Sequence, residues 1–493
     1  MTTGTAILED GTRLPYVITD NPPRGGMKYT YFAPDKSYVV QFFNDPREAE
    51  NPYLQARLSA IIGKYNPTRA ESDGGAQGNT PETAAYFQKR YCWPTAIVTS
   101  PEFGIVCPAY PQNFFFGPNA AVVPELNLAG KDKRSSWFTS KNRRFLERGE
   151  LGNFRNMLYI SICLARAVRR MHQAGLAHSD LSSNNVLIDP QTGTCVVIDI
   201  DTLVVPGLYP PEVVGTRGYV APEVLATMEL DFRDPRRRLP SVYSDLHALA
   251  VLIYEYLLLR HPLIGPKIHD SSSPERDDHL SLGERALFVE HPTDHSNRPD
   301  GIHVTIDALG PKLKELFLKA FVDGLHNPDA RPTAMDWEKA LCRAADLLHP
   351  CSNPHCAAKE FILHDPKNPI CPFCGMKVQT GQILTIRQKS LMRGKQGQFL
   401  HAGEFTGYDG MPLFRWHFYA NSYPDEKTSR EMLGYLCRSG GEWLLVNQAA
   451  KGLTSPGGHL VPPGKAILLR NGTAFRVSDD PRGYLFEVQV TNI

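Results

Sequence analysis

The sequence lacks a net charge, a long apolar run and a leader-like N-terminus. Its 53 Lys and Arg residues balance 52 Asp and Glu residues, for a formal charge of +1, so no global field favours nucleic acid or an acidic membrane. The most apolar stretch, Leu246–Leu259, contains Glu255 and is shorter than the roughly 20 residues of a membrane-spanning helix, which predicts a buried helix instead. No basic segment followed by an apolar run opens the chain. We therefore expect no signal peptide, a cytoplasmic location, and neither a membrane nor a nucleic acid as partner.

The apolar residues that are present suffice for several cores. Hydrophobic residues make up 42% of the 493 and charged residues 21%, which excludes a broadly disordered chain. The length predicts about three domains at roughly 150 residues each. Residue periodicity predicts strands in the first 45 residues, a helix at 52–65, a hairpin at 96–110, helices from 154 to about 345 and short strands after 380. Residues 71–81 and 267–300 are predicted to be polar loops.

A polar loop from His178 to Asn185 is the most informative segment. It holds Asp180 and Asn185 five positions apart, and an apolar strand further along the chain ends at Asp199. Transfer of a γ-phosphoryl group needs a carboxylate that orients the attacking hydroxyl, together with oxygen ligands that hold Mg²⁺ against the phosphates. We expect Asp180 to orient the hydroxyl, and Asn185 and Asp199 to bind the metal.

These residues resemble the signature of the bacterial Hanks-type (eukaryotic-like) Ser/Thr protein kinases. The motif H-x-D-L-x-x-x-N begins at His178, Asp199 stands where the family has D-F-G, and A-P-E ends at Glu223. A later D-A-R-P-T motif places Arg331 where the family pairs an arginine with that glutamate. The resemblance implies a bilobal kinase fold, with an N-lobe at 1–110 and a C-lobe at 111–348. It also implies ATP and Mg²⁺ (or Mn²⁺) as cofactors and a protein as substrate.

The nucleotide site departs from the family pattern. Gln41 stands where the third strand carries its lysine, and Lys28 stands at the third glycine of the glycine-rich loop. This arrangement resembles the with-no-lysine kinases, which implies that Lys28 replaces the missing lysine as the catalytic and phosphate-binding cation, beside Gln41. In the alternative, Lys28 is a solvated strand residue and nucleotide binding is weak. We expect Val39 and the connection from Cys107 to Tyr110 to line the adenine slot.

Other departures concern the helix at 52–65 and the catalytic loop. The helix has no glutamate to pair with the phosphate-binding lysine. Either no ion pair forms, or the partner is one of Glu48, Glu50 and Gln55. Ser179 replaces the Arg of H-R-D, so activation through a phosphorylated loop is not expected. Ser182 replaces a Lys that usually touches the γ-phosphate, and Asp201 replaces the glycine of D-F-G and offers an extra metal carboxylate.

The three residues expected to orient the hydroxyl and bind the metal, Asp180, Asn185 and Asp199, are all present. Their presence favours an active, atypical serine/threonine kinase. The competing hypothesis is a nucleotide-binding pseudokinase that serves as a scaffold for protein partners. Kinases of this type with accessory C-terminal domains often share a gene cassette with a von Willebrand A protein and a metal-dependent serine/threonine phosphatase. The resemblance therefore implies these two proteins as partners.

Four cysteines gather at 349–379 with the spacing of a zinc ribbon: Cys351, Cys356, Cys371 and Cys374. Such knuckles place four thiolates around a structural Zn²⁺ at about 2.3 Å, and the glycine of C-P-x-C-G permits the required turn. His355 is an alternative ligand to Cys356, and a redox pair at Cys371 and Cys374 is a weaker competitor. The other six cysteines are scattered and are expected to be packing residues.

The last segment, 380–493, resembles a forkhead-associated (FHA) domain, an all-β sandwich. Arg415, Ser429 and Arg430 stand where that family binds phosphothreonine through Arg and Ser donors. Other positions of the family's motif differ, namely Phe414, Met432 and Lys451-Gly452. The expected fold is thus multidomain α+β: a kinase, a zinc ribbon and an FHA-like module. The alternative for the last module is a β-sandwich that only docks onto the kinase or a partner, with Arg415 an ordinary strand-edge charge.

Overall fold

The computed structural model describes residues 2–205, 215–231, 234–392, 395, 397–420, 422, 424 and 430–493. The chain divides into two compact units. The first comprises Met1–Gly152, Asn156–Asp300 and Leu316–Glu338, and the second comprises Asn153–Arg155, Gly301–Glu315 and Lys339–Ile493. Each unit is described by itself.

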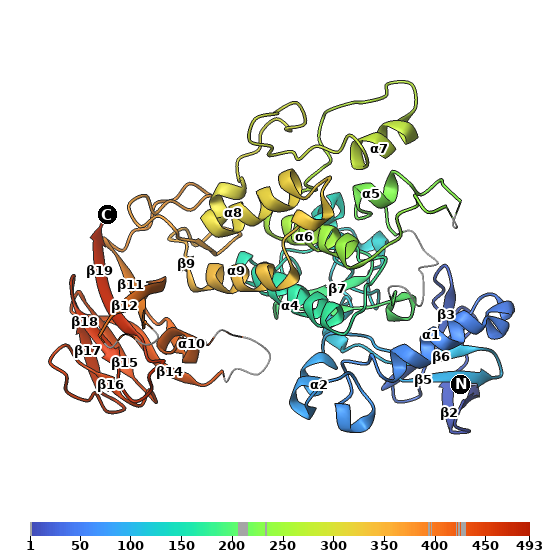
Figure 1. Ribbon diagram of the computed structural model, residues 1–493, viewed down its shortest axis with the longest axis horizontal. Helices are drawn as coiled ribbons and strands as arrows, with labels where there is room; N and C mark the ends of the chain where they lie inside the picture. Colours follow the sequence, from blue (N-terminus) through green and yellow to red (C-terminus); the bar gives the residue numbers. More distant parts are fainter. Residues whose placement is uncertain are drawn as a thin grey trace. The chain divides into compact units, whose positions relative to one another are not determined.

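A six-stranded antiparallel sheet opens the first unit, in the order β2-β1-β5-β6-β4-β3 (Figure 1). Its strands are β1 (Thr3–Leu8), β2 (Arg13–Val17), β3 (Lys28–Phe32), β4 (Tyr38–Phe43), β5 (Ala96–Ser100) and β6 (Gly104–Pro108). Because successive side chains of a strand point to opposite faces, the apolar residues form two clusters. Val40 and Phe42 belong to one. Val39 and Phe43 belong to the other, where they pack with Leu54 and Leu58 of helix α1.

Helix α1 (Pro52–Ile62) starts at a residue suited to capping. The Asn51 side chain accepts hydrogen bonds from the amides of Tyr53 and Leu54 at 3.1 and 3.2 Å, and proline occupies the first helical position, where no amide hydrogen is needed. The following segment folds around the side chain of Asn79, which donates to Pro67 O at 2.8 Å. It leads into α2 (Pro81–Phe87).

The helical part of the first unit contains α6 (Val242–Leu258), the helix that the apolar run predicts. Every residue from Ser244 to Leu258 is buried, and Ser241 and Ser244 form a capping box at its start. The other elements between residues 136 and 346 are α3 (Ser136–Thr139), α4 (Phe154–Gln173), the hairpin of β7 (Val186–Asp189) and β8 (Thr194–Val197), α5 (Pro222–Leu225), α7 (Pro274–Leu282), α8 (Pro311–Leu318) and α9 (Ala334–Asp346). Helices α4, α8 and α9 each have residues in both units.

The second unit contains a small hairpin and a β-sandwich (Figure 1). The hairpin is β9 (Leu348–Pro350) with β10 (Glu360–Ile362). One sheet of the sandwich has the order β12-β11-β19-β18-β16 and the other β13-β14-β15-β17. Their elements are β11 (Gln382–Leu391), β12 (Phe399–Gly407), β13 (Pro412–Phe414), α10 (Arg415–Phe418), β14 (Met432–Ser439), β15 (Glu442–Asn447), β16 (Leu453–Thr454), β17 (Ala466–Leu469), β18 (Ala474–Val477) and β19 (Leu485–Asn492). Phe405, Trp443 and Phe486 lie in one core between the sheets.

The sequence predictions and the structure agree on the long periodic segments and differ on short polar ones. The strands near the N-terminus, the hairpin at 96–110 and the buried helix are present. The helix predicted at 52–65 stops at Ile62, before Gly63. The predicted loop at 71–81 contains a 3-10 turn, and the predicted loop at 267–300 contains α7. Polar helices of this length carry little apolar periodicity.

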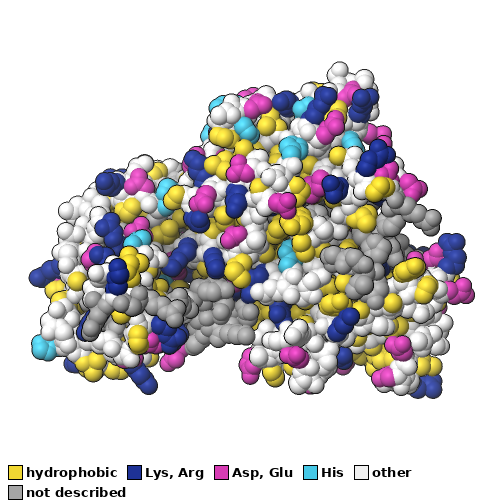
Figure 2. Space-filling view, viewed as in Figure 1, with side chains coloured by type: hydrophobic (Ala, Val, Ile, Leu, Met, Phe, Trp, Pro, Cys, Tyr) yellow, Lys and Arg dark blue, Asp and Glu magenta, His cyan; other side chains and the backbone are white. Residues whose placement is uncertain are grey.

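Charges of both signs are mixed on the face shown in Figure 2, where Lys and Arg side chains are interspersed with Asp and Glu. The formal charge of the whole chain is +1. In the part of the chain that the structure describes, no helix has both the length and the apolar character needed to cross a bilayer.

Candidate active site

The loop between α4 and β7 brings Asp180 and Asn185 into contact. The side-chain nitrogen of Asn185 donates to Asp180 Oδ2 at 2.9 Å and to the Asp180 carbonyl at 2.8 Å. Because the nitrogen is used in this way, the oxygen of the Asn185 amide is the atom left to bind a cation. Strand β7 starts at the residue after Asn185, so the hairpin of β7 and β8 fixes the position of the Asn185 amide oxygen.

Thr216, for which the sequence predicts no role, binds the other oxygen of the Asp180 carboxylate. Its backbone nitrogen and its hydroxyl donate to Asp180 Oδ1 at 2.6 and 2.8 Å. Both oxygens of Asp180 are therefore oriented, one by Asn185 and one by Thr216. The sequence does contain a signal that could have identified Thr216. It is a hydroxyl residue that directly follows Gly215, at the start of the segment that ends in A-P-E.

The catalytic loop is anchored to the buried helix α6. The backbone nitrogen of His178 donates to Asp245 Oδ2 at 2.7 Å, and its ring Nε2 lies 2.9 Å from the carbonyl of Ile198. His178 is fully buried. Ser179 then takes a φ of 63°, a left-handed conformation that turns the chain sharply before Asp180. Neighbouring elements thus determine the position of the carboxylate.

Asp199 and Asp201 lie on the turn that follows β8. Asp199 has a φ of 63° and begins the 3-10 turn Ile200–Thr202. Its side chain is 45% exposed, whereas that of Asp201 is 4% exposed. The two carboxylates of this turn therefore meet different surroundings, one open to solvent and one enclosed.

Strand register places Lys28 and Gln41 on one face of the sheet. Thr30 pairs directly with Gln41 and Lys28 with Phe43, and residues two apart on a strand share a face. Gln41 is engaged locally, since it donates to Thr30 Oγ1 at 3.2 Å and accepts from Cys107 Sγ at 3.7 Å. Lys28 extends instead to the turn after β8.

The ammonium group of Lys28 meets both carboxylates of that turn. Lys28 Nζ lies 3.4 Å from Asp199 Oδ1 and forms a shorter contact with Asp201 Oδ1. Lys28 is only 7% exposed. Burial alone would lower the pKa of this amine, but the charges of Asp201 and then Asp199 raise the pKa above its usual value, so Lys28 is a cation.

The residues predicted to line an adenine slot lie on and beside β6. Val39 pairs with Cys107 across β4 and β6, and both belong to the cluster that faces α1. The ring of Tyr110 stacks on Phe115 with centroids 4.9 Å apart. A hydrogen bond with Cys92, followed by burial, raises the pKa of Cys107, so this residue stays a neutral thiol.

None of the three candidate partners from the helix region contacts Lys28. Glu48 accepts a hydrogen bond from Asn51 at 3.0 Å, and Gln55 donates to the carbonyl of Ala49 at 2.5 Å. Among the residues that the structure describes, the ion pairs of Lys28 are those with Asp199 and Asp201, and Glu50 does not take part.

The predicted ion pair of Arg331 with Glu223 is present. Its two guanidinium nitrogens donate to the two carboxylate oxygens at 2.8 and 2.7 Å. Arg331 is buried and also donates to the carbonyl of Tyr243 at 2.9 Å. A bidentate pair of this kind fixes the A-P-E segment against the start of α6.

The four clustered cysteines converge on one point of the second unit. All four sulfurs lie within 4.8 Å of one another, with Cys351 Sγ 3.5 Å from Cys374 Sγ and Cys356 Sγ 3.9 Å from Cys371 Sγ. Tetrahedral ligation with metal–sulfur bonds of about 2.3 Å requires sulfurs about 3.8 Å apart. The four thiols fit such a centre and form no disulfide. Gly375, with a φ of 73°, makes the turn after the second knuckle.

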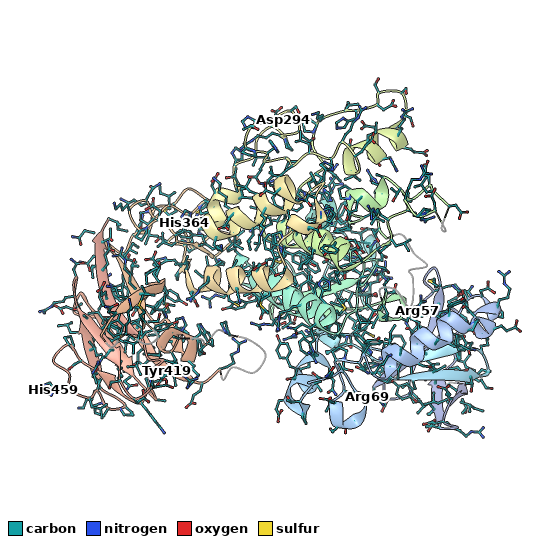
Figure 3. All side chains as sticks on the ribbon, viewed as in Figure 1. Arg57, Arg69, Asp294, His364, Tyr419 and His459 are labelled. Carbon is teal, nitrogen blue, oxygen red and sulfur yellow. The ribbon has the colours of Figure 1, made fainter. Side chains whose placement is uncertain are left out.

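In the β-sandwich, Arg415 and Arg430 pack on neighbouring aromatic rings. The guanidinium carbon of Arg415 lies 4.5 Å from the centroid of Tyr419, a residue labelled in Figure 3, and that of Arg430 lies 5.4 Å from Trp416. The Tyr419 hydroxyl is 3.4 Å from the carbonyl of Lys451. Arg415 thus lies at the end of the sandwich that carries α10. The third predicted residue, Ser429, lies outside the described residues.

Comparison with known families supplies an independent view of this site. Residues 140–340 match the family model described as protein kinase domain. This part of the chain is similar to a protein kinase domain. The match includes the loop of Asp180 and Asn185, the turn of Asp199, and the Arg331–Glu223 pair.

Curated relatives match over part of the chain. The anti-Muellerian hormone type-2 receptor of Homo sapiens is 34% identical over 141 residues, which cover 24% of this chain and 23% of the receptor. A serine/threonine-protein kinase of Myxococcus xanthus is 26% identical over 191 residues (36% of this chain, 29% of that kinase). A probable serine/threonine-protein kinase of Streptomyces coelicolor is 28% identical over 185 residues (36% and 23%). The chain thus spans less than a third of the length of each of these relatives.

Among solved structures, the chain is similar to a rhoptry antigen kinase domain of Toxoplasma gondii. The sequence identity is 14%, the match covers 69% of this chain and 85% of that one, and the TM-score is 0.39.

Proposed function

We propose that this chain is a protein serine/threonine kinase that uses ATP with Mg²⁺ (or Mn²⁺). Asp180 orients the attacking hydroxyl, Asn185 and Asp199 bind the metal, and Lys28 neutralises phosphate charge beside Gln41. Val39, Cys107 and Tyr110 line the adenine slot. The kinase domain match at 140–340 and the names of the bacterial relatives support the reaction class.

The residues present fit the two cofactors. Carboxylate and amide oxygens are hard ligands of the kind that Mg²⁺ takes, and both Asp199 and Asn185 offer such an atom. Mg²⁺ held by Asn185 and Asp199 would supply positive charge that neutralises phosphate oxygens. Lys28, on β3, is a cation that lies 3.4 Å from Asp199 and supplies a second positive charge. The chain's own residues therefore provide the orientation and the charge that phosphoryl transfer needs.

One observation carries the proposal: the side chains of Asp180, Asn185 and Thr216 form a single hydrogen-bonded group. A carboxylate held on both oxygens is placed to orient a hydroxyl and to accept its proton. The direct test is transfer of radiolabel from the γ-phosphate of ATP to a generic protein substrate. We expect transfer by the wild type and loss of nearly all of it in Asp180→Ala.

A matched control uses another carboxylate of the same domain. Asp35→Asn changes an exposed turn residue whose carboxylate contacts Ser37, and it should label substrate as the wild type does. Equal labelling by Asp180→Ala and the wild type would contradict the kinase assignment. Thermal stabilisation by ATP without any transfer would instead support the pseudokinase scaffold.

For the cysteine cluster we propose a structural zinc ribbon around 349–379, held by Cys351, Cys356, Cys371 and Cys374. The sulfur spacing supports this metal, and four thiolates leave no open coordination position for catalysis. Cys356, not His355, lies with the other three sulfurs, and His355 is exposed.

For the β-sandwich we propose an FHA-like reader of phosphothreonine that uses Arg415 with Ser429 and Arg430. Two arginines, each packed over an aromatic ring, offer donors for a phosphate group. A von Willebrand A protein and a metal-dependent phosphatase from the same gene cassette, and a cytoplasmic location, stay predictions.

A further inference from the structure

A buried carboxylate, Asp201, occupies a position that the proposed reaction does not yet use. Its side chain is 4% exposed and that of its partner Lys28 is 8% exposed. The two residues are 173 positions apart in the chain. A buried charge is tolerated only with a partner of opposite sign, so each of the two requires the other.

Helix α1 cannot supply the partner. Its sequence, PYLQARLSAII, contains no acidic residue, and its buried residues are Leu54, Arg57, Leu58 and Ile61. Arg57, labelled in Figure 3, is 3% exposed, so the helix carries a buried cation and no anion. The turn that bears Asp201 contacts α1. The carboxylate therefore lies beside the helix but belongs to a different element.

We infer that Asp201 is the positioning residue that directs Lys28 to the phosphates of the nucleotide, in place of a glutamate on α1. This inference rests on the proposed function. It gives the two aspartates of one turn separate tasks. The enclosed Asp201 holds the lysine, and the half-exposed Asp199 binds the metal.

The difference in exposure supports this division. The exposed part of Asp199 can be approached by a hydrated metal ion, which keeps several of its waters. The carboxylate of Asp201 is closed to such an ion, and its Oδ1 makes the closest contact of Lys28 Nζ. The sequence offered Asp201 as an extra metal carboxylate, and its enclosure by Lys28 favours the new role.

The test measures binding of two ligands to the full chain by calorimetry: the non-hydrolysable analogue AMP-PNP with Mg²⁺, and adenosine. In Asp201→Asn, which keeps the size of the side chain but removes its charge, we expect AMP-PNP affinity to fall about 10–100-fold, the range seen when a partner that orients a metal ligand is lost. Adenosine affinity should not change, because adenosine carries no phosphate. Lys28 would then turn to Asp199, so the Mg²⁺ concentration needed for half-maximal binding should rise.

Three further variants separate positioning from folding. Asp201→Glu keeps the charge and should bind AMP-PNP more tightly than Asp201→Asn. Glu48→Gln and Glu50→Gln should bind it as the wild type does. If Asp201→Asn matches the wild type, or if Glu48→Gln or Glu50→Gln shows the larger loss, the inference is wrong and the kinase proposal stands. If Asp201→Asn weakens both ligands equally, the role is structural only, which also overturns the inference. A wild type that binds AMP-PNP no better than adenosine would overturn both.

Discussion

Lys28 and Gln41 share one face of the sheet but carry different chemistry. Gln41 uses its amide on Thr30 and Cys107, whereas Lys28 extends to the turn that bears Asp199 and Asp201. The cation, and not the amide, is therefore the group that can meet a phosphate. The difference follows from where each residue stands in its strand, since Lys28 is the first residue of β3.

Replacement of these two residues should have unequal effects on catalysis. Lys28→Ala removes the cation proposed to meet the phosphates and should lower kcat/KM for ATP by about 10²–10³-fold, the cost of losing one preorganised donor. Gln41→Ala loses two local hydrogen bonds and should cost about tenfold or less. The measurement is steady-state transfer at varied ATP, with thermal unfolding of both variants as the folding control. A larger loss in Gln41→Ala than in Lys28→Ala would contradict the role of Lys28.

Glu255, on the buried helix α6, should make stability depend on pH. Burial raises the pKa of its carboxyl from 4.5 to about 7, although the hydrogen bond from Tyr219, at 2.6 Å, lowers it in part. The folded state therefore binds the proton more tightly than the unfolded state does. Stability should be highest below the unfolded pKa and should fall as pH rises from about 4.5 to about 7.

The variant Glu255→Gln keeps an acceptor for Tyr219 and removes the charge. Melting temperatures measured from pH 5 to pH 8 should fall in the wild type and stay level in the variant. At pH 8 we expect the variant to be more stable by about 2–3 kcal/mol. The control is Glu290→Gln, which removes the carboxylate paired with Arg260 at 2.5 Å and should destabilise the chain. Parallel pH curves for the wild type and Glu255→Gln would contradict the buried-charge explanation.

Short sequence separation decided which site residues could be predicted. Asp180 and Asn185 are five positions apart in one loop, so their contact follows from local sequence. The pair of Lys28 and Asp201 spans 173 positions. The family resemblance implied that Lys28 meets the phosphates, and the sequence offered Asp201 only as an extra metal carboxylate. Only the packing of the turn after β8 against the sheet shows that the two residues face each other.

Helices and strands, like site residues, could be predicted where a local sequence signal was strong. Helix α6 could be predicted because its apolar run leaves no alternative to burial, and the sandwich strands could be predicted from their alternation. Helices α2 and α7 were missed. Each begins at a proline after a capping Thr80 or Ser273, a signal of helix start that outweighs weak periodicity.

The proposed zinc ribbon yields a prediction at the scale of one element. The full chain, as purified, should contain about one zinc ion per molecule, measured by inductively coupled plasma mass spectrometry, because four thiolates complete a tetrahedral site. Cys371→Ser removes a buried ligand and should lose the metal. The control Cys437→Ser changes a cysteine of β14, and His355→Ala removes the alternative ligand. Both should keep the zinc. Loss of zinc in His355→Ala would show that the histidine, and not Cys356, binds it.

For the whole molecule, the division into two units implies that the two proposed activities are separable. Asp180 belongs to the first unit, and the sandwich has a core cluster of its own, formed by residues between 384 and 488. Substitutions at distant, independent sites act separately. The near-zero net charge adds no long-range field that would couple the sites.

Two assays on the same full-length variants test this separation. Asp180→Ala should abolish phosphoryl transfer but leave the affinity for a phosphothreonine peptide, measured by fluorescence anisotropy, within about twofold. Arg415→Ala should weaken peptide binding by about tenfold or more, because a charge-assisted hydrogen bond contributes about 1.5–3 kcal/mol, while transfer to a generic substrate stays unchanged. Arg470→Ala is the matched control, since Arg470 is exposed and pairs with Glu442 at 2.8 Å. Equal peptide binding by Arg415→Ala and Arg470→Ala would show that the sandwich does not read phosphate through Arg415. A loss of peptide binding in Asp180→Ala would show that the two units act together.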